Sequence, residues 1–231
     1  MKILVVIPTK IELDFFLKAC RSRGYQAQAI SIGRLKATCF PALDITVAQG
    51  GLGKTQFAVQ TQHLIDTTHW DLVICAGAAG ALVEDLSKGD VVIATQSVEH
   101  DIKNKFGRPL LPRFDGAANI LELCRQSLSS ETSFHVHYGP VASGDEDVVE
   151  RERREAIQKQ TGALAVAWEG AGGARAAQFS GVPYLEIRGV TDSANGIAAF
   201  DFMITVKKAM RNVAHVVLSL ALRSANSAEA G

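Results

Sequence analysis

The chain has 231 residues, an ordinary length for one large α/β domain and enough to bury a substantial core. Its 24 basic and 24 acidic side chains balance, and no stripe of basic residues with interleaved aromatic residues occurs, which argues against a nucleic-acid polymer as partner. A chain without net charge also tends to associate with itself, so we expect an oligomer.

The two most apolar runs of the chain do not indicate a membrane segment. The run 3–7 is short and is followed at once by Glu12 and Asp14, which is typical of a buried first strand rather than of a signal peptide. The late run 213–222 contains His215 and has about half the length of a membrane span. We therefore expect no contact with a membrane.

The four cysteines are scattered along the chain, without the Cys-x-x-Cys spacing of a zinc site or the pattern of a disulfide framework. The histidines also lack the spacing of metal ligands. We therefore expect no metal, no other cofactor and a location in the reducing cytoplasm.

Short runs of β-branched residues alternate with longer amphipathic stretches along the chain. The expected strands are 3–7, 45–48, 72–75, 91–94, 135–141, 164–166 and 184–190. The expected helices are 11–22, 54–66, 117–128, 147–160, 168–179 and 200–222. This alternation predicts a single α/β domain over residues 1–224, with a mostly parallel sheet and helices on both faces. Residues 225–231 are expected to form a disordered tail.

In such a sheet, ligands bind in the loops that follow the strands. The turn 50–55 ends like a phosphate-binding loop, but that motif needs a glycine where Ala48 stands, so we expect only a glycine-rich turn that can approach a ligand closely. The small residues 75–81 have two equally good interpretations: they allow a helix to pack tightly, or they leave room for a flat ligand. Further on, Ser143 or Asp145 is suited to cap the charged helix that follows.

Two acidic residues are the strongest candidates for a binding site. Glu169 follows an apolar strand and stands among Trp, Ala and Gly, where a carboxylate is costly unless it binds something. Asp192 lies at the carboxyl end of the strand 184–190. The alternative for either residue is a structural ion pair with Arg188. Glu12 by itself indicates only the preference of an acidic residue for the first turn of a helix.

A series of motifs runs through nearly the whole chain. They are Met1–Ile3, Glu12, Gly51–Lys54, Gly77–Gly80, Lys88–Val92, His100–Asp101, Ala142–Asp145, Ala165–Val166, Glu169, Val182–Tyr184, Arg188, Asp192 and Phe200–Asp201. From Met1 to about Leu222 this series resembles the 5′-methylthioadenosine/S-adenosylhomocysteine nucleosidases of the purine nucleoside phosphorylase superfamily. Each motif alone is weak, whereas all of them in order are specific. The resemblance implies a three-layer α/β/α domain of the nucleoside phosphorylase type, with a mostly parallel or mixed sheet.

The resemblance also implies a catalytic role for four residues. Cleavage of a ribosidic bond passes through an oxocarbenium-like sugar, so an enzyme must help the base leave and present a nucleophile on the opposite face. Asp192 matches the acid that protonates purine N7, a role that requires a desolvated site to raise its pKa. Glu12 matches the group that activates water. Glu169 matches the residue that binds the ribose hydroxyls, with Arg188 orienting nearby groups.

The substrate and the assembly follow from the same resemblance. The substrate-binding residues that it implies are Leu52, Ala78, Ala79, Val148, Trp168, Phe200 and Phe106. The region of Phe106 is expected to reach the site of a neighbouring subunit, so the oligomer is expected to be a homodimer.

Two positions favour hydrolysis over phosphorolysis. Phosphorylases of the superfamily carry an arginine just before the Gly77 motif, where this chain has Ala76 preceded by Cys75. Glu12 also places negative charge where phosphate would bind. We therefore expect hydrolysis that releases the free base and a ribose derivative, as in methionine salvage.

Other positions depart from the nucleosidase pattern and leave alternatives open. Asp147 stands where an aromatic residue stacks on adenine, Ala78 replaces a serine and Trp168 replaces a methionine. The segments 168–170 and 185–188 also resemble futalosine hydrolases of the same superfamily. The alternatives are thus a futalosine-type or other purine nucleoside hydrolase, a nucleoside phosphorylase, and a non-catalytic nucleoside-binding or storage homologue.

Overall fold

The computed structural model describes residues 1–103, 106–107 and 110–229. The strands are β1 (Ile3–Ile7), β2 (Gln28–Ile32), β3 (Leu35–Phe40), β4 (Ile45–Gln49), β5 (Leu72–Ala81), β6 (Val91–Glu99), β7 (Arg113–Asp115), β8 (Val136–Ser143), β9 (Ala165–Ala167) and β10 (Tyr184–Asp192). The helices are α1 (Lys10–Ser22), η1 (Pro41–Leu43), α2 (Lys54–Thr67), α3 (Ala118–Ser127), α4 (Arg151–Thr161), α5 (Gly170–Phe179) and α6 (Ala198–Glu229). Within these ranges, no helix has both the length and the apolar character needed to span a lipid bilayer.

All strands belong to one mixed sheet. Its order is β10-β6-β8-β9-β5-β1-β4-β3-β2, with β7 added beside β6. The central strands β4, β1, β5 and β10 are parallel, whereas β10–β6, β5–β9 and the β2–β3–β4 meander are antiparallel. A further pairing of β10 with β5 closes half of the sheet into a ring of five strands. The predicted α/β domain with a mostly parallel or mixed sheet is confirmed.

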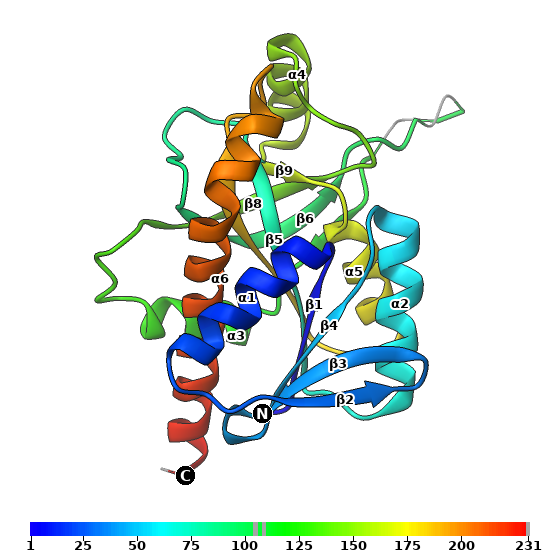
Figure 1. Ribbon diagram of the computed structural model, residues 1–231. Helices are drawn as coiled ribbons and strands as arrows, with labels where there is room; N and C mark the ends of the chain where they lie inside the picture. The colour runs from blue at the N-terminus through cyan, green and yellow to red at the C-terminus, as the bar shows by residue number, and fades with distance from the viewer. Residues whose placement is uncertain (104–105, 108–109, 230–231) are drawn as a thin grey trace.

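Helices cover both faces of the sheet (Figure 1). Successive residues of β1 point to opposite faces: Ile3 and Val5 pack in a core with α1, α3 and α6, and Leu4 and Val6 pack in a second core with α2 and α5. Because β1 is buried on both faces, its sequence is a continuous apolar run rather than an alternating one.

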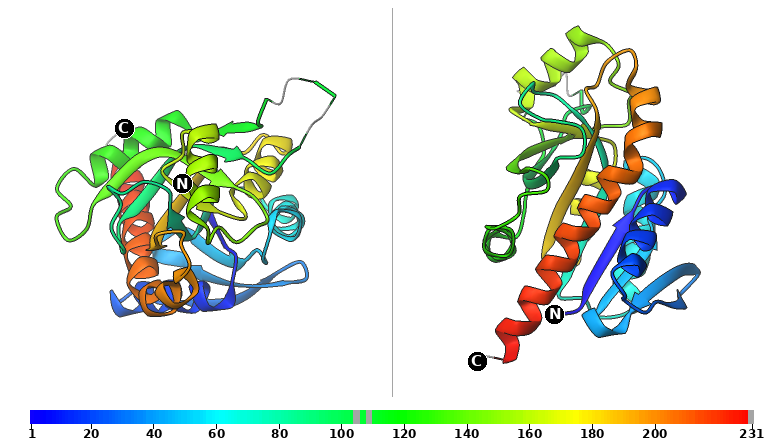
Figure 2. Two further views of the ribbon diagram at one scale, coloured as in Figure 1. Left: turned by 90° about the horizontal axis from the view of Figure 1, so that it is seen from above. Right: turned by 60° about the vertical axis from the view of Figure 1, so that its left-hand side comes forward.

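The long helix α6 runs along the length of the domain (Figure 2) and packs against β10. Val206, Ala209 and Val213 lie on its buried stripe. The approach is close, because a Cβ atom on Gly189 of β10 would lie only 2.9 Å from the Cβ atom of Ala209. This packing fixes the position of the amino end of α6 beside the carboxyl end of β10.

The structure corrects several expected elements. Strands β2, β3 and β7 were not expected, and β5 and β6 extend well past residues 75 and 94. Helix α4 begins at Arg151 rather than at 147, so residues 145–150 form a loop. The expected tail is helical through Glu229, because alanine and glutamate favour a helix and no proline interrupts it. Residues 230–231 lie outside the described part of the chain.

Candidate functional site

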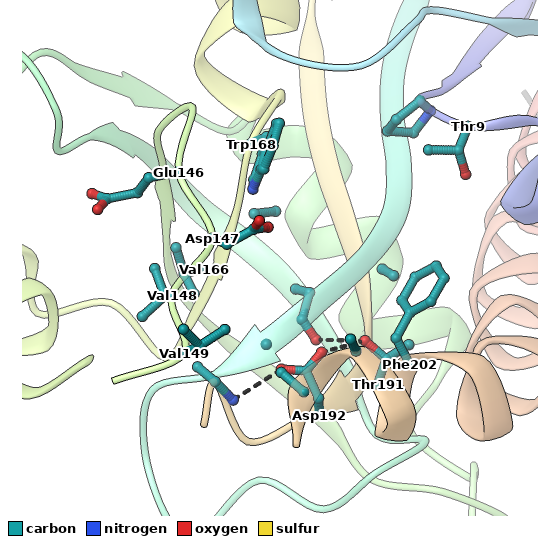
Figure 3. A pocket seen from close by; sticks show the side chains of 18 of the residues that line it. Thr9, Glu146, Asp147, Val148, Val149, Val166, Trp168, Thr191, Asp192 and Phe202 are labelled. Atoms are coloured by element: carbon teal, nitrogen blue, oxygen red, sulfur yellow. Dashed lines mark hydrogen bonds between the residues drawn. The ribbon is translucent and has the colours of Figure 1, made fainter. Parts of the chain in front are cut away.

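A cavity of about 630 Å³ lies where several strands end (Figure 3). Pro8 and Thr9 follow β1, Leu52 follows β4, and Asp192 ends β10. This is the expected position of a ligand in such a sheet. Eight of the predicted site residues line the cavity: Glu12, Leu52, Ala78, Ala79, Val148, Trp168, Glu169 and Asp192.

Glu12 is held in the first turn of α1 by hydrogen bonds to both of its carboxylate oxygens. Thr9 caps the helix, and its backbone N–H donates to Oε2 over 3.0 Å while its hydroxyl donates to the same atom. The backbone N–H of Ala78, in β5, donates to Oε1 over 2.7 Å. These donors fix the orientation of the carboxylate. Glu12 is therefore a buried, oriented acceptor that can take a proton from a molecule in the cavity.

Glu169 stands at the start of α5 and joins the cavity to a buried ion-pair network. Its Oε1 accepts from the backbone N–H of Gly53 over 3.3 Å, and its Oε2 pairs with Nη2 of Arg188 over 3.3 Å. Burial raises the pKa of Glu169; Arg188 opposes this rise, and the nearby charge of Glu12 adds to it.

Arg188 is wholly buried and does not line the cavity. Its Nε donates to Oε1 of Glu186 over 2.8 Å, and its Nη1 donates to the carbonyl oxygen of Ala78 over 3.3 Å. Arg188 therefore supports Glu169 from behind the cavity wall. The structural ion pair that we considered for Arg188 is formed with Glu169 and Glu186, and not with Asp192.

Asp192 lies next to a bulge at the end of β10 and is 9% exposed. Its Oδ1 accepts from the backbone N–H of Ala194 over 2.9 Å, and its Oδ2 lies 2.8 Å from the hydroxyl of Thr191 (Figure 3). Burial raises the pKa of Asp192, and these two hydrogen bonds oppose the rise. A raised pKa is what a general acid needs in order to keep its proton near neutral pH.

Ser143 and Asp145 do cap helices, but not the helix that follows them in sequence. The Ser143 hydroxyl accepts from the backbone N–H of Ala171, in the first turn of α5, over 3.0 Å. Asp145 Oδ1 accepts from the backbone N–H of Lys54, at the start of α2, over 2.8 Å. The expected cap of α4 is therefore wrong, because the chain forms a loop from Asp145 and enters α4 only at Arg151.

Two predicted substrate-binding residues lie away from the cavity. Phe200 is 66% exposed, and Phe202 and Met203 of α6 line the cavity in its place. A helix turns by about 100° per residue, so positions 200 and 202 lie on opposite faces. Phe106 is fully exposed in the loop after β6. Its expected contact with a second subunit stays a prediction.

Several lining residues were not predicted. Thr9, Glu146, Val149, Thr191, Phe202 and Met203 belong to this group, and Asp147 was noted only as a departure from the family pattern. The buried Glu186 was also missed as a partner of Arg188. Its position two residues before Arg188 in a strand places both side chains on one face, and that spacing was an available signal.

Within the described residues, no cluster of His, Cys, Asp and Glu is suited to hold a metal ion. All four cysteines are free.

Comparison with known proteins places this architecture in a family. The family model described as "Phosphorylase superfamily" matches residues 2–222. Aminodeoxyfutalosine nucleosidase of Helicobacter pylori is 31% identical over 77% of this chain and 80% of that protein. A 5′-methylthioadenosine/S-adenosylhomocysteine nucleosidase of an Exiguobacterium species is 28% identical over 78% and 81%.

Solved structures agree with the sequence comparison. The nucleosidase of Neisseria meningitidis, in complex with methylthio-immucillin-A, superposes with a TM-score of 0.86, covers 96% of this chain and 99% of its own, and is 29% identical. The native futalosine hydrolase of Helicobacter pylori has a TM-score of 0.84 at 25% identity and covers 95% and 97%.

The fold and the cavity thus define an enzyme of the nucleosidase type, as expected. The chain belongs to the phosphorylase superfamily and resembles, within it, nucleosidases of two substrate classes. The predicted reaction type, hydrolysis of the N-glycosidic bond of a purine nucleoside, is confirmed at the level of the family.

Proposed function

We propose that this chain hydrolyses a nucleoside of the 5′-methylthioadenosine or S-adenosylhomocysteine type to free base and a ribose derivative. The observation that carries the proposal is that three carboxylates line one cavity and that each has a different environment. Glu12 accepts hydrogen bonds at both oxygens, Glu169 is paired with Arg188, and Asp192 has a raised pKa caused by burial.

The three carboxylates divide the reaction between them. Asp192 donates its proton to N7 of the purine, the C1′–N9 bond breaks, and its electron pair leaves with the base. The ribosyl group becomes an oxocarbenium-like cation, with Glu169 accepting hydrogen bonds from its hydroxyls. Glu12 takes a proton from water, and the water oxygen forms the new bond to C1′. Arg188 keeps Glu169 in position from behind.

The charge of the cavity favours water over phosphate as nucleophile. Five acidic residues line it, Glu12, Glu146, Asp147, Glu169 and Asp192, and no Lys, Arg or His does so among the residues that the structure describes. A phosphate anion in this cavity would meet Glu12 and Asp147, which form no ion pair with any described residue, and no lining cation would attract it. This disfavours the phosphorylase alternative.

A futalosine-type nucleoside is the second candidate substrate. It is favoured by the similarity to the aminodeoxyfutalosine nucleosidase and by the segments 168–170 and 185–188. Both candidates share the same bond and the same three carboxylates, so they differ in the groups that surround the reacting centre.

The cellular setting belongs to the same proposal. We infer a homodimer from the nucleosidase resemblance, a cytoplasmic location from four free thiols, and a role in methionine salvage from the first substrate class.

A panel of purine nucleosides, incubated with the protein with and without phosphate, tests the proposal through the released base. We expect release that does not depend on phosphate. Release that requires phosphate would overturn the hydrolase assignment, and tight binding without release from any nucleoside would favour the storage homologue.

A further inference from the structure

The loop between β8 and α4 carries three consecutive acidic residues, and only two of them have partners. Asp145 caps α2 through the backbone N–H of Lys54, over 2.8 Å. Glu146 pairs with Arg153, whose Nε donates to Oε2 over 3.0 Å. Asp147 forms no hydrogen bond or ion pair with any residue that the structure describes. Its carboxylate is exposed and is thus free to accept a hydrogen bond from a molecule in the cavity.

The backbone around Asp147 is held firmly on both sides. The N–H of Gly144 donates to the carbonyl oxygen of Ala167 over 3.1 Å, and the N–H of Asp145 donates to Oδ2 of Asp101 over 2.9 Å. Val148, the next residue, is buried. A ligand that binds Asp147 therefore meets a carboxylate on an ordered backbone, so little further ordering of the loop opposes binding.

The Asp147 side chain points into the cavity, on the side opposite Thr9 (Figure 3). Thr9 and Glu12 mark the end at which water attacks the sugar in the proposed reaction. The opposite wall, which also holds Val148 and Trp168, therefore faces the base. This placement rests on the proposed function.

Among the described residues no protein donor contacts Asp147, so a bound ligand can donate to its carboxylate in place of water. Among the described residues, no basic side chain lines the cavity and no hydrogen bond joins the indole N–H of Trp168 to Asp147. The donor that Asp147 can select is therefore one carried by the ligand. In purines the neutral N–H donors on the six-membered ring are the exocyclic amino groups and N1–H of the 6-oxo bases.

We propose that Asp147 is a specificity-determining residue whose carboxylate accepts a hydrogen bond from an amino group of the purine. It thereby selects adenine nucleosides over nucleosides of unsubstituted purine, which has no N–H donor on its six-membered ring. An aromatic residue at this position would select only for a flat base, whereas a carboxylate selects for a donor on that base.

The test compares an adenine nucleoside with the purine riboside that lacks its amino group and carries the same 5′ group. The ratio of the two kcat/KM values is measured for the wild type, Asp147→Asn and Asp147→Ala. A hydrogen bond to a charged acceptor predicts that alanine lowers the ratio by about tenfold to a hundredfold, through the adenine nucleoside alone. Asparagine keeps an acceptor oxygen and should give an intermediate ratio.

Glu150→Ala is the matched control. Glu150 is exposed, lies three residues further along the same loop, forms no side-chain cap of α4 and does not line the cavity. Its loss should leave the ratio unchanged. An unchanged ratio in Asp147→Ala, or an equal loss on both nucleosides, would overturn the proposal for Asp147 while the nucleosidase activity stands.

Binding of the free bases adenine and purine, measured by calorimetry, separates this inference from the proposed function. A preference for adenine that Asp147→Ala abolishes supports the role of Asp147 even in a protein that cleaves no nucleoside. Equal affinity of the wild type for adenine and purine would overturn that role even in an active enzyme.

Discussion

Asp192 combines two opposing influences on its proton. Burial raises its pKa, while the donors from Ala194 and Thr191 favour the carboxylate. The Thr191 hydroxyl also lies 3.3 Å from the carbonyl oxygen of Ala79. It can therefore donate to that carbonyl and accept a hydrogen bond from the protonated Asp192 carboxyl, which gives the acid a partner. Catalysis by this acid should be lost as pH rises through its raised pKa.

The first prediction is that Asp192→Asn abolishes turnover of adenine nucleosides and leaves the fold intact. Loss of a general acid predicts a decrease in kcat of about 10²-fold to 10⁴-fold. Because the pKa is raised on folding, ionisation of Asp192 favours the unfolded chain above the unfolded pKa of about 4. The variant should therefore have a higher Tm than the wild type at pH 8, and this difference should disappear near pH 3. Near-normal turnover would exclude Asp192 as the acid.

A second prediction concerns Glu186, which is wholly buried and shares the charge of Arg188 with Glu169. Replacement by leucine leaves Arg188 with one carboxylate, and we expect the free energy of unfolding to fall by about 2–3 kcal/mol. Glu186→Gln keeps an acceptor for Arg188 Nε, so its free energy of unfolding should fall by less than that of the leucine variant. Urea unfolding of both variants measures the difference, and a leucine variant as stable as the wild type would contradict the structural role of this pair.

For individual residues, the sequence indicated which side chains are chemically unusual but not how they are oriented. Glu169 and Asp192 could be predicted, because a carboxylate among small and apolar residues at a strand end is costly to bury unless it binds a ligand or pairs with a cation. Phe200 was misplaced because the helical phase at the start of α6 depends on the loop that precedes it. Arg188 was predicted, but its position behind the cavity wall depends on Glu186 and β10 together.

Among the elements, α5 is the one whose packing bears most directly on the site. It begins directly after Glu169 and consists largely of glycine and alanine in its buried turns, which lets it approach α2 closely. A Cβ atom on Gly172 would overlap the carbonyl oxygen of Lys54 and lie 3.1 Å from its Cα atom. The small residues after Glu169 therefore permit close packing of α5 against α2 directly behind this cavity residue.

The third prediction is that Gly172→Ala destabilises the protein by about 1–3 kcal/mol, because the backbone of α2 must move to admit the methyl group. The same movement should shift Glu169 and lower kcat/KM. Gly196→Ala is the control, since a Cβ atom there meets nothing within 4 Å. Thermal unfolding and kcat/KM are measured for both variants. Equal Tm and equal kcat/KM in the two variants would contradict close packing at Gly172.

Strand β1 was predicted with its exact bounds because it is buried on both faces and its apolar run is unbroken. The hairpin of β2 and β3 was missed since most of β2 is exposed, which removes the alternating pattern of a half-buried strand. The second half of β5 was missed because Gly77 to Ala81 have low strand propensity and are held by pairing with β10 and β9.

For the whole molecule, a second hollow beside the cavity is a candidate surface for assembly. Leu52 borders both the cavity and a second hollow of about 420 Å³, which Val59 also lines. Leu52 is 54% exposed and Val59 is 66% exposed. Asp145, which also borders this hollow, is tied through Asp101 to the start of the loop that carries Phe106. Exposed apolar residues next to a site favour a protein interface there.

The last prediction is that the protein is a homodimer in which this hollow faces the second subunit. Sedimentation should give a mass of twice 24.7 kDa. A charge at Val59 costs nothing in a monomer, because that side chain is exposed, but a desolvated charge opposes association. Val59→Asp should therefore produce monomers and lower kcat/KM, whereas Phe179→Asp, at an 85% exposed position at the end of α5, should leave the dimer intact. A wild type of single-chain mass with full activity would contradict the predicted dimer, and a Val59→Asp dimer would place its interface elsewhere.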